Sequence, residues 1–332
     1  MLIRKEIEER ERKFLSPYAT LSCKTKGRKH PEKECNFRTA FQRDRDRILH
    51  SKAFRRLKHK TQVFISPVED HYRTRLTHTL EVAQIARTIA RALKLNEDLA
   101  EAIALGHDLG HTPFGHAGEY VLDDILKTNF GQRFFHNEQS IRIVEVLERE
   151  GKGLNLCYEV LDGIRHHTPD DPLPITLEGQ IVRLADRIAY LRHDIEDAIR
   201  ARVLKESDLP AKPMKILGRH ILDRIVTSII KHSYDRPEIK MEKEVQFAMD
   251  ELYNFMYQKV YTNPLAKKEE AKVPELLRQL FRYYHYNLEF QRGIKEKDQL
   301  QHTVDFIAGM TDRYAINKFK ELFIPDEWRA KG

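Results

Sequence analysis

The sequence predicts an all-α fold. Apolar residues recur at helical spacing through most of the 332 residues, whereas strand-like alternation is confined to one short segment, Val63–Ile65. The composition, with 41% hydrophobic and 33% charged residues, is that of a globular protein with a charge-rich surface. A chain of this length can bury a sizeable core without support from disulfides or a structural metal.

Two segments carry the clearest helical pattern. Residues 75–94 place apolar side chains at positions i, i+3, i+4 and i+7 between Leu76 and Leu93. Residues 97–109 continue in the same way, and Gly110 is a natural stop for that helix. Similar patterns predict helices over residues 39–64, 117–128, 137–150, 157–167, 178–201, 217–233, 241–261, 274–290 and 297–322.

Proline and glycine segments divide the chain. They lie at residues 112–115, 168–174 and 209–213, and the third separates a histidine-rich part from a C-terminal helical part. We therefore expect three regions, which are a basic arm over residues 1–38, a core over 39–204 and a helical region over 205–332.

The composition also excludes several classes of protein. The sequence has no run of about 18 apolar residues, so we expect no transmembrane helix and no membrane partner. The first residues lack the apolar core of a secretory signal. Three scattered cysteines (Cys23, Cys35 and Cys157) do not make a disulfide framework, so a reducing, cytoplasmic setting fits best.

Positive charge is concentrated near the N-terminus. Residues 1–62 hold 19 Lys and Arg against 8 Asp and Glu, a net charge of +11. Such a region attracts polyanions, although a solvated helical face explains the charge equally well. Arg43, Arg45 and Arg47 alternate with aspartates, so salt bridges are an alternative to phosphate contacts.

Histidines cluster in the middle of the chain. Nine of the 16 lie between residues 71 and 193, and histidine is both a common metal ligand and a general acid or base at neutral pH. Five metal-competent side chains fall within 13 residues at the end of an apolar helix and in the loop after it; they are His107, Asp108, His111, His116 and Glu119.

Two further residues point toward the same site. His78 shares a helix face with Val82 and Ile85, and Asp186 shares one with Val182 and Ala189. A buried histidine or aspartate is costly unless it is paired. One divalent cation bound by His78, His107, Asp108 and Asp186 would satisfy all four and leave open coordination positions, as a catalytic site requires.

The order His…His-Asp…Asp resembles the signature of the HD-domain metal phosphohydrolases. Longer strings are similar to the deoxyguanosinetriphosphate triphosphohydrolase (dGTPase) family, in its bacterial dGTPase-like branch, over about residues 36–200. They are RDRDRI at 43–48, AFRRLK at 53–58, KTQVF at 60–64, HDLGH at 107–111, FGHAGE at 114–119 and DRIAY at 186–190.

This resemblance implies an HD metal-phosphohydrolase core that hydrolyses a deoxynucleoside triphosphate (dNTP), dGTP and other dNTPs among them, to deoxynucleoside and inorganic triphosphate. It assigns the four residues above as metal ligands and His116 with Glu119 as the catalytic pair. Mg²⁺ or Mn²⁺ is the expected ion, with Fe, Co, Ni or Zn as alternatives. The family also implies a homo-oligomer and, in some members, a nucleotide activator.

The resemblance further assigns seven substrate contacts. Two histidines and two arginines correspond to positions near the triphosphate, and three other residues correspond to positions around the sugar. The phosphate group is Arg75, His111, His136 and Arg187, and the sugar group is Gln62, Tyr190 and Asp194. An aromatic ring under the sugar leaves no room for a 2′-hydroxyl, so Tyr190 explains a deoxy preference.

Two other functions fit the same residues. One is an HD-type phosphodiesterase or nucleotidase acting on another nucleotide. The other is a nucleic-acid-binding regulatory protein that uses the basic N-terminal region and has a vestigial HD site. His166 and His167 suggest a second metal, as in two-metal HD phosphodiesterases, but a helix end before Pro169 or a supporting position around the first site is the favoured interpretation.

Overall fold

The computed structural model describes residues 3–62, 73–261 and 268–325. The prediction of an all-α fold is confirmed, because this part of the chain forms helices and has no β-strand. Two isolated β-bridges, Arg28 with Cys157 and Thr61 with Thr74, are the extended pairings within it. The strand-like segment Val63–Ile65 and His71 lie outside the described residues.

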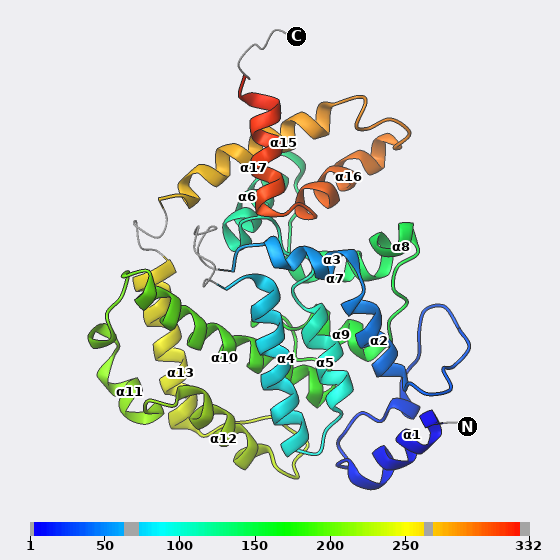
Figure 1. Ribbon diagram of the computed structural model, residues 1–332, viewed down its shortest axis with the longest axis vertical. Coiled ribbons are helices and arrows are strands. Elements are labelled where there is room, and N and C mark those ends of the chain that lie inside the picture. The colour runs from blue at the N-terminus through cyan, green and yellow to red at the C-terminus, as the bar shows by residue number, and fades with distance from the viewer. Residues whose placement is uncertain (1–2, 63–72, 262–267, 326–332) are drawn as a thin grey trace, which may run out of the picture.

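Figure 1 shows the helices in chain order, with a long connection between α1 and α2 that contains only one short 3₁₀ turn. The α-helices are α1 (Ile3–Phe14), α2 (Ala40–Leu49), α3 (Lys52–Arg56), α4 (Arg75–Ala92), α5 (Glu97–Gly106), α6 (Gly115–Phe130), α7 (His136–Arg142), α8 (Glu148–Gly151), α9 (Tyr158–Arg165), α10 (Leu177–Arg200), α11 (Ala211–Leu217), α12 (Ile221–Ser233), α13 (Lys243–Met256), α15 (Val273–Tyr286), α16 (Glu296–Ala308) and α17 (Asp312–Phe323). Short 3₁₀ turns lie at Ser22–Lys24, Leu57–His59, Glu206–Asp208 and Glu270–Lys272, and π-helical turns at Ile143–Leu147 and Tyr257–Tyr261.

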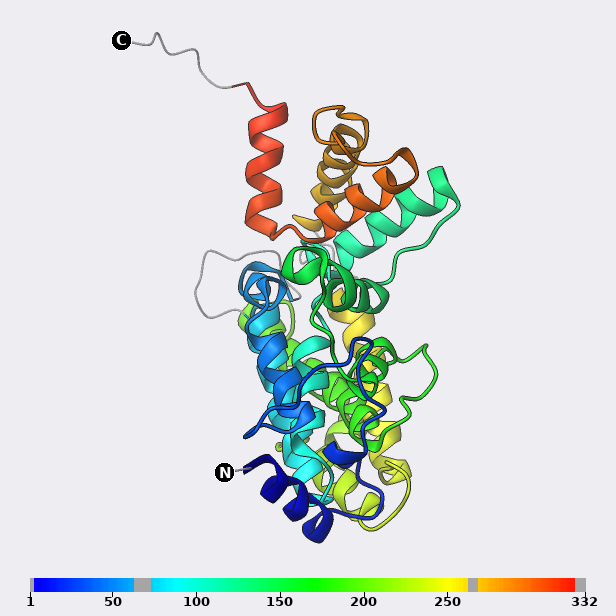
Figure 2. The same ribbon diagram turned by 90° about the vertical axis from the view of Figure 1, so that its right-hand side faces the viewer.

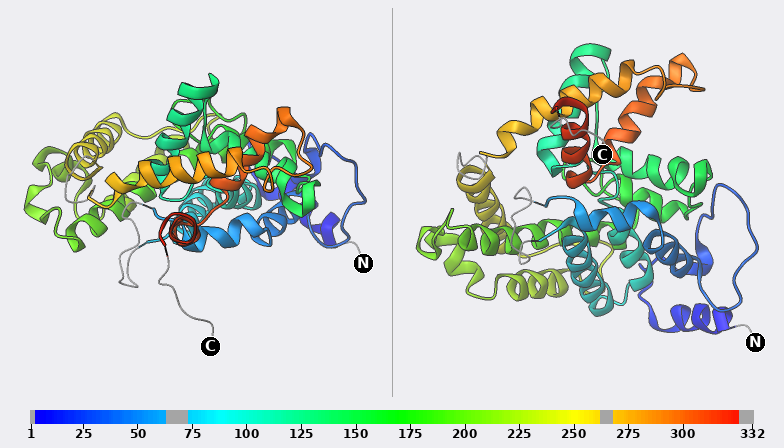
Figure 3. Two further views of the ribbon diagram at one scale, coloured as in Figure 1. Left: turned by 90° about the horizontal axis from the view of Figure 1, so that it is seen from above. Right: turned by 45° about the horizontal axis from the view of Figure 1, so that its top comes forward.

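The main core is built around α4 and α5. These helices pack against each other, α10 packs against both, and α2 and α9 cover α5. Their apolar stripes are largely buried, as the helical spacing of residues 75–94 and 97–109 predicts, although Leu76 is half-buried and Leu80 is 49% exposed near the start of α4. Helix α1 and helix α11 lie on opposite sides of this core (Figures 1 and 3).

A second apolar cluster joins α6 to the C-terminal helices α15, α16 and α17. These four helices lie together at one end of the molecule (Figure 2). Helix α6 begins at Gly115, immediately after the histidine-rich segment, so its first turn belongs to the candidate site while its later turns pack on α15. The C-terminal region therefore supports a helix that carries predicted catalytic residues.

Three of the expected helices are interrupted, and two of the breaks are capped. The helix predicted over residues 137–150 passes from α7 into the π-helical turn Ile143–Leu147 and loses helical geometry at Arg149 and Glu150, whose φ angles are 53° and 59°. The helix predicted over residues 39–64 breaks at Ser51, whose hydroxyl accepts a hydrogen bond from the Phe54 amide and caps α3. The carboxylate of Glu148 also accepts the amide of Ala53 at 2.7 Å. The helix predicted over 297–322 breaks before Thr311, which caps α17. Because caps satisfy the free amides of a helix start, both breaks are stable.

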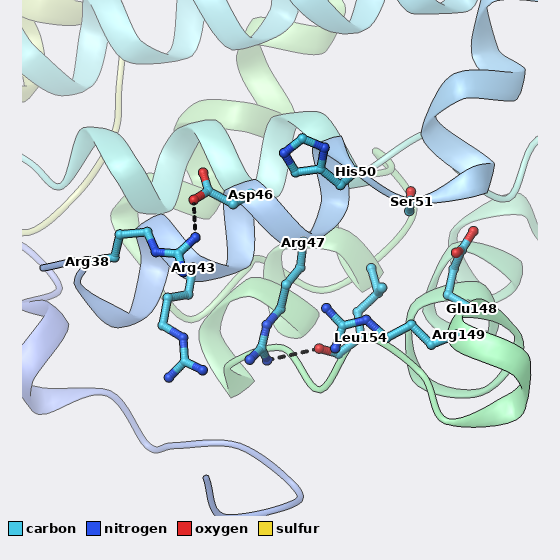
Figure 4. A pocket seen from close by; sticks show the side chains of 9 residues that line it. All are labelled: Arg38, Arg43, Asp46, Arg47, His50, Ser51, Glu148, Arg149 and Leu154. Carbon is cyan, nitrogen blue, oxygen red and sulfur yellow. Dashed lines mark hydrogen bonds and ion pairs between the residues drawn. The ribbon is translucent and has the colours of Figure 1, made fainter. Parts of the chain in front are cut away.

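The arginines of the RDRDRI string form ion pairs, as one of the two interpretations expected. Arg47 and Arg43 pair with Glu32 at 2.7 and 3.3 Å. Arg45 pairs with Asp98 on α5 at 3.1 Å. Arg43 and Arg47 also line a cavity of about 340 Å³ between α2 and residues 148–154 (Figure 4).

No helix in the described part of the chain is both long enough and apolar enough to span a membrane.

Candidate metal centre and active site

The structure brings the four predicted metal ligands together from three helices. His78 lies on α4, His107 and Asp108 directly follow α5, and Asp186 lies on α10. Asp186 Oδ1 is 3.0 Å from His78 Nε2 and 3.7 Å from His107 Nε2. The Asp108 carboxylate is 3.4 Å from His107 Nε2 and 3.9 Å from His78 Nε2. Side chains separated by up to 108 positions in sequence thus converge on one point.

The donor set fits a divalent cation. His107 Nδ1 is 2.6 Å from the Ala104 carbonyl, which only accepts, so in the neutral ring the proton lies on Nδ1 and the lone pair on Nε2. That buried Nε2 faces two carboxylates and has no hydrogen-bond partner within the described residues. A lone pair facing carboxylate oxygens is repulsive unless a proton or a cation lies between them.

The pKa values of His107 and Asp186 reflect the attraction between the imidazoles and the carboxylates of this cluster. Burial opposes the imidazolium of His107, but the carboxylates of Asp108 and Asp186 outweigh burial and raise its pKa to about 9. Burial opposes the charged form of Asp186 as well, yet hydrogen bonds and charge from His107 and His78 lower its pKa. The cluster thus holds its carboxylates ionised and places positive charge between them.

Arg75 lies fully buried under the cluster. Its Nη1 donates to Asp108 Oδ2 at 2.7 Å, while Nε and Nη2 have no hydrogen-bond partner within the described residues. The pKa of Asp108 is held well below its usual range, because His107, Arg75 and His111 together outweigh the effect of burial. Arg75 therefore orients one predicted ligand, Asp108, and keeps two donors for another anion.

The turn after α5 depends on Gly110. Its amide donates to the Ser140 hydroxyl at 2.8 Å, and that hydroxyl donates to the His107 carbonyl at 2.8 Å. A Cβ at Gly110 would lie 2.1 Å from the His136 carbonyl oxygen and 2.3 Å from the Ser140 amide nitrogen. The backbone of α7 thus packs directly against the turn that carries the ligands.

Gly110→Ala is expected to lower the free energy of unfolding by about 3 kcal/mol, because both colliding atoms are backbone and cannot swing away. Gly131→Ala is the matched control, since Gly131 has a φ of +65° but open space around it, and only strain of about 1 kcal/mol is expected there. Urea unfolding of the two variants measures the difference. Equal losses would show that α7 does not pack as closely as described.

The predicted catalytic pair is also assembled. His116 Nδ1 donates to Glu119 Oε2 at 3.1 Å, and His116 Nε2 accepts from the Tyr190 hydroxyl at 3.1 Å. The His116 side chain is 47% exposed, so it is open to a ligand. Glu119 Oε1 accepts the amide and Nδ1 of His136 at 2.9 and 2.8 Å. Although burial favours its neutral form, the charge of His136 and hydrogen bonds from His116 and His136 hold the pKa of Glu119 well below its usual range.

A stack of imidazoles connects the two halves of the site. The rings of His111 and His136 are stacked with centroids 3.9 Å apart, and His136 Nε2 lies 3.2 Å from His167 Nε2. The ring of His167 also meets that of His107 edge-on at 5.0 Å. Burial, and then the neighbouring His107 and His136, lower the pKa of His167 to about 3. Sequence reasoning left His167 either at a helix end or in a supporting position around the first site, and its contacts with His107 and His136 agree with the second alternative.

The other residues predicted to bind the substrate differ in their positions and hydrogen-bond partners. Tyr190 lies beside the candidate metal site, with its ring centroid 5.0 Å from that of His78. Gln62 is buried and its amide atoms have no hydrogen-bond partner within the described residues. Asp194 is buried on α10, one turn beyond Tyr190. Arg187 instead donates to Asp250 on α13 at 2.8 Å.

Sequence reasoning also missed His193. It is buried on α10, its ring is 5.8 Å from that of His78, and its Nε2 contacts the Glu81 carboxylate. Its spacing of seven residues from Asp186 is the signal that could have found it, because residues two helical turns apart share a face.

The C-terminal helices hold the loops of the site in place. Buried Lys60 donates to the Ala308 carbonyl at 2.9 Å and to the His111 carbonyl. Asp312 accepts the amides of Thr61 and Phe114, each at 2.8 Å. These bonds join the segment before Gln62 and the turn after His111 to α16 and α17.

Two known domain families match this chain. The HD domain family matches residues 75–191, and the phosphohydrolase-associated domain matches residues 239–321. The helical core and its His/Asp cluster therefore define an HD-domain phosphohydrolase with a candidate metal site.

Relatives that align with nearly the whole chain show which family of HD-domain phosphohydrolases it belongs to. The chain is 56% identical to a deoxyguanosinetriphosphate triphosphohydrolase-like protein of Caldanaerobacter subterraneus subsp. tengcongensis, across 99% of this chain and 98% of that one. It is 50% identical to a protein of the same name from Desulfatibacillum aliphaticivorans, across 98% and 99%. The chain belongs to the deoxyguanosinetriphosphate triphosphohydrolase-like family, which confirms the resemblance.

A crystal structure of a hypothetical protein from Aquifex aeolicus has a similar fold. Its TM-score is 0.53 at 20% sequence identity, and the match covers 86% of this chain and 69% of that chain.

Proposed function

We propose that this protein hydrolyses a dNTP to the deoxynucleoside and inorganic triphosphate in a metal-dependent reaction. The observation that carries the proposal is the placement of His116 and Glu119 directly beside the cluster of His78, His107, Asp108 and Asp186. The printed names of the relatives support the same substrate class, because they are triphosphohydrolase-like proteins named for deoxyguanosine triphosphate.

The four-residue cluster is where the cation would bind. A divalent ion there supplies Lewis-acid stabilisation of the charge that develops on the α-phosphoryl oxygens. Mg²⁺ and Mn²⁺ are the ions we propose first. Arg75 contributes independently, because its two unpaired donors lie beside Asp108 and suit a planar contact with phosphate oxygens.

His116 is proposed to move the proton. The oxygen of water forms a bond to the α-phosphorus, the bond from phosphorus to the 5′-oxygen breaks, and the departing oxygen takes up a proton. Glu119 holds the proton on Nδ1 of His116, so Nε2 is the atom that exchanges a proton with the attacking or departing oxygen. The Tyr190 hydroxyl occupies that position in the free protein.

The remaining substrate residues are proposed from their chemistry. His111 and His136 line the wall between the cluster and His116, where donors to a polyphosphate are required. Gln62, Tyr190 and Asp194 are proposed for the sugar. Arg187 would have to leave Asp250 to reach the triphosphate, since the two are paired here.

Tyr190→Ala is expected to reduce discrimination between dGTP and GTP, measured as the ratio of their kcat/KM values, by about tenfold or more, because the ring no longer blocks a 2′-hydroxyl. Tyr190→Phe is the control, since it keeps the ring and loses only the hydroxyl that contacts His116. Unchanged discrimination in Tyr190→Ala would contradict the assignment of Tyr190 to the sugar pocket.

Product analysis tests the function itself. The purified protein is incubated with each dNTP and Mn²⁺ or Mg²⁺, and products are resolved by ion-exchange chromatography. Deoxynucleoside with inorganic triphosphate supports the proposal, whereas nucleoside monophosphate or free phosphate supports a phosphodiesterase or nucleotidase. Salt-sensitive DNA binding without hydrolysis under any divalent ion would support a regulatory nucleic-acid-binding protein.

A homo-oligomer, a nucleotide activator and a cytoplasmic setting complete the proposal. The cavity in Figure 4 supports an activator with phosphate groups, because Arg38, Arg43, Arg47 and Arg149 line it. Burial and the neighbouring Arg47 lower the pKa of Arg149, as expected where cationic groups crowd together. The three cysteines are free thiols, which is consistent with a reducing compartment.

A further inference from the structure

The buried carboxylate of Asp312 joins two segments of the candidate site. Asp312 is the first residue of α17 and is 4% exposed. Its Oδ2 accepts hydrogen bonds from the Thr61 amide, at 2.8 Å, and from the Thr61 hydroxyl, and its Oδ1 accepts the amide of Phe114 at 2.8 Å. Thr61 directly precedes Gln62, and Phe114 lies two residues before His116. One side chain therefore bridges the segment with the predicted sugar contact and the turn with the proposed proton-transfer group.

The turn before His116 has an unusual backbone. Phe114 and Gly115 have φ angles of 64° and 59°, both in the left-handed region. This region is ordinary for glycine but unfavourable for an aromatic residue. Phe114 is held in it because its amide donates to Asp312 and its ring is buried in the apolar cluster of α6 and the C-terminal helices. These dihedral angles set the direction in which α6 leaves the turn, and His116 is the second residue of that helix.

The same turn packs directly against the segment that contains Gln62. A Cβ on Gly115 would lie 3.3 Å from the Thr61 carbonyl oxygen and 3.5 Å from the Gln62 carbonyl oxygen. It would also lie 3.1 Å from Nη2 of Arg75, one of the unpaired donors described above. Because backbone meets backbone at this contact, a shift of the turn moves His116 relative to both Gln62 and Arg75.

Lys60 supplies a parallel connection and a counter-charge. Its buried ammonium donates to the carbonyls of Ala308 and His111, so it also joins the C-terminal helices to the site. Burial raises the pKa of Asp312, while the hydrogen bonds from its partner segments and the charge of Lys60 oppose that effect. A buried carboxylate is costly, and the proposed chemistry does not use this one directly. Its contacts with the two segments are the contribution that remains.

We propose that Asp312 is a positioning residue for the reaction and that it acts through His116. By fixing the backbone at Phe114, its carboxylate holds His116 in register with the segment that carries Gln62. A displacement of about 1 Å at a reacting group can lower a rate about 10²-fold, so a side chain that never touches the substrate can control kcat. The inference rests on the proposed function, because that function assigns the proton transfer to His116.

Asp312→Asn tests this role with little change of shape. The asparagine oxygen can accept one backbone amide, but its NH₂ group meets the other amide as a second donor. We expect kcat for dNTP hydrolysis to fall about tenfold or more, with a smaller change in KM and an unchanged metal content. The matched control is Asp305→Asn, since Asp305 also joins a C-terminal helix to the rest of the chain, but its partners Gln139 and Arg142 lie on α7. This control should keep the wild-type kcat.

A double variant separates positioning from a general weakening of the fold. If Asp312 acts through His116, Asp312→Asn should lower kcat less than about threefold when His116→Gln is already present, because residues that act as a unit are not additive. Loss of kcat by the same factor in both backgrounds is the result of a merely structural role and would overturn the proposal.

The environment of His116 can also be followed without substrate. In protein labelled with ¹³C at the histidine Cε1 atoms, the His116 resonance is identified by its absence from His116→Gln. Asp312→Asn should shift this resonance in the presence of Mg²⁺, whereas Asp305→Asn should leave it in place. An unshifted resonance in folded Asp312→Asn would overturn the proposal.

A second variant covers the case in which Asp312→Asn does not fold. Thr61→Val removes the hydroxyl that donates to Asp312 but keeps the backbone amide, so it should shift the same resonance by a smaller amount. No shift in folded Thr61→Val would then overturn the proposal. The spectra also separate this inference from the proposed function, because a shifted resonance in a protein that hydrolyses no dNTP removes the proposed function and leaves the positioning contact in place.

Discussion

Asp108→Ala is expected to abolish cation binding and turnover together. Asp108 is buried, belongs to two candidate metal groups and accepts a hydrogen bond from Arg75 at 2.7 Å. Loss of Lewis-acid stabilisation worth several kcal/mol corresponds to a decrease in kcat of about 10³-fold or more. Metal content of the purified variant and its rate of dNTP hydrolysis are measured on the same preparation.

The stability of this variant needs its own measurement. Removing Asp108 leaves Arg75 fully buried without its anionic partner, which costs about 3–5 kcal/mol. Asp108→Asn keeps the shape and one acceptor, so it serves as the better-folded comparison, and circular dichroism reports folding in both. Activity retained in a metal-stripped preparation of either variant would refute the assignment of Asp108 as a ligand.

His116→Gln is expected to reduce kcat by about 10²- to 10⁴-fold while bound metal stays at the wild-type level. We expect the metal to stay bound because His116 contacts Glu119 and Tyr190 but belongs to neither of the candidate metal groups that contain Asp108. Metal content and kcat are measured in parallel, so the two functions of the site are separated.

The control for this variant is His220→Gln, an exposed histidine that precedes α12. It should leave both quantities unchanged. If His116→Gln loses metal in proportion to activity, His116 is a ligand and not the proton-transfer group. Glu119→Gln should lower kcat in the same direction, because the amide removes the charge that orients His116.

Much of the fold followed from local patterns. The stripes in residues 75–94 and 97–109 are the faces by which α4 and α5 pack, since helical periodicity depends only on neighbouring residues. The helix breaks followed only in part, because Ser51 and Thr311 are local capping residues, whereas the amide of Ala53 at the start of α3 is satisfied by Glu148, which lies 95 positions away. A cap supplied by a distant side chain leaves no local signal.

The candidate site, like the fold, could be predicted from the sequence only in part. The proximity of the proposed ligands could be predicted because His78 lies on an apolar face and His107-Asp108 ends an apolar helix, both of which are visible in the residue order. The residue order allowed a supporting position for both His166 and His167, but it could not show which of the two rings enters the site. The choice depends on how the end of α9 is oriented against α5 and α7, which pack against it.

The sequence by itself determined the all-α class, the amphipathic faces of the main helices and the residue types that can bind a cation, because these depend on composition and short-range spacing. Only the tertiary structure decided which buried side chains lie close to Asp108 and that the C-terminal helices anchor the loops around Gln62 and His111. Those contacts join residues up to 251 positions apart, and packing of the whole chain sets their distances.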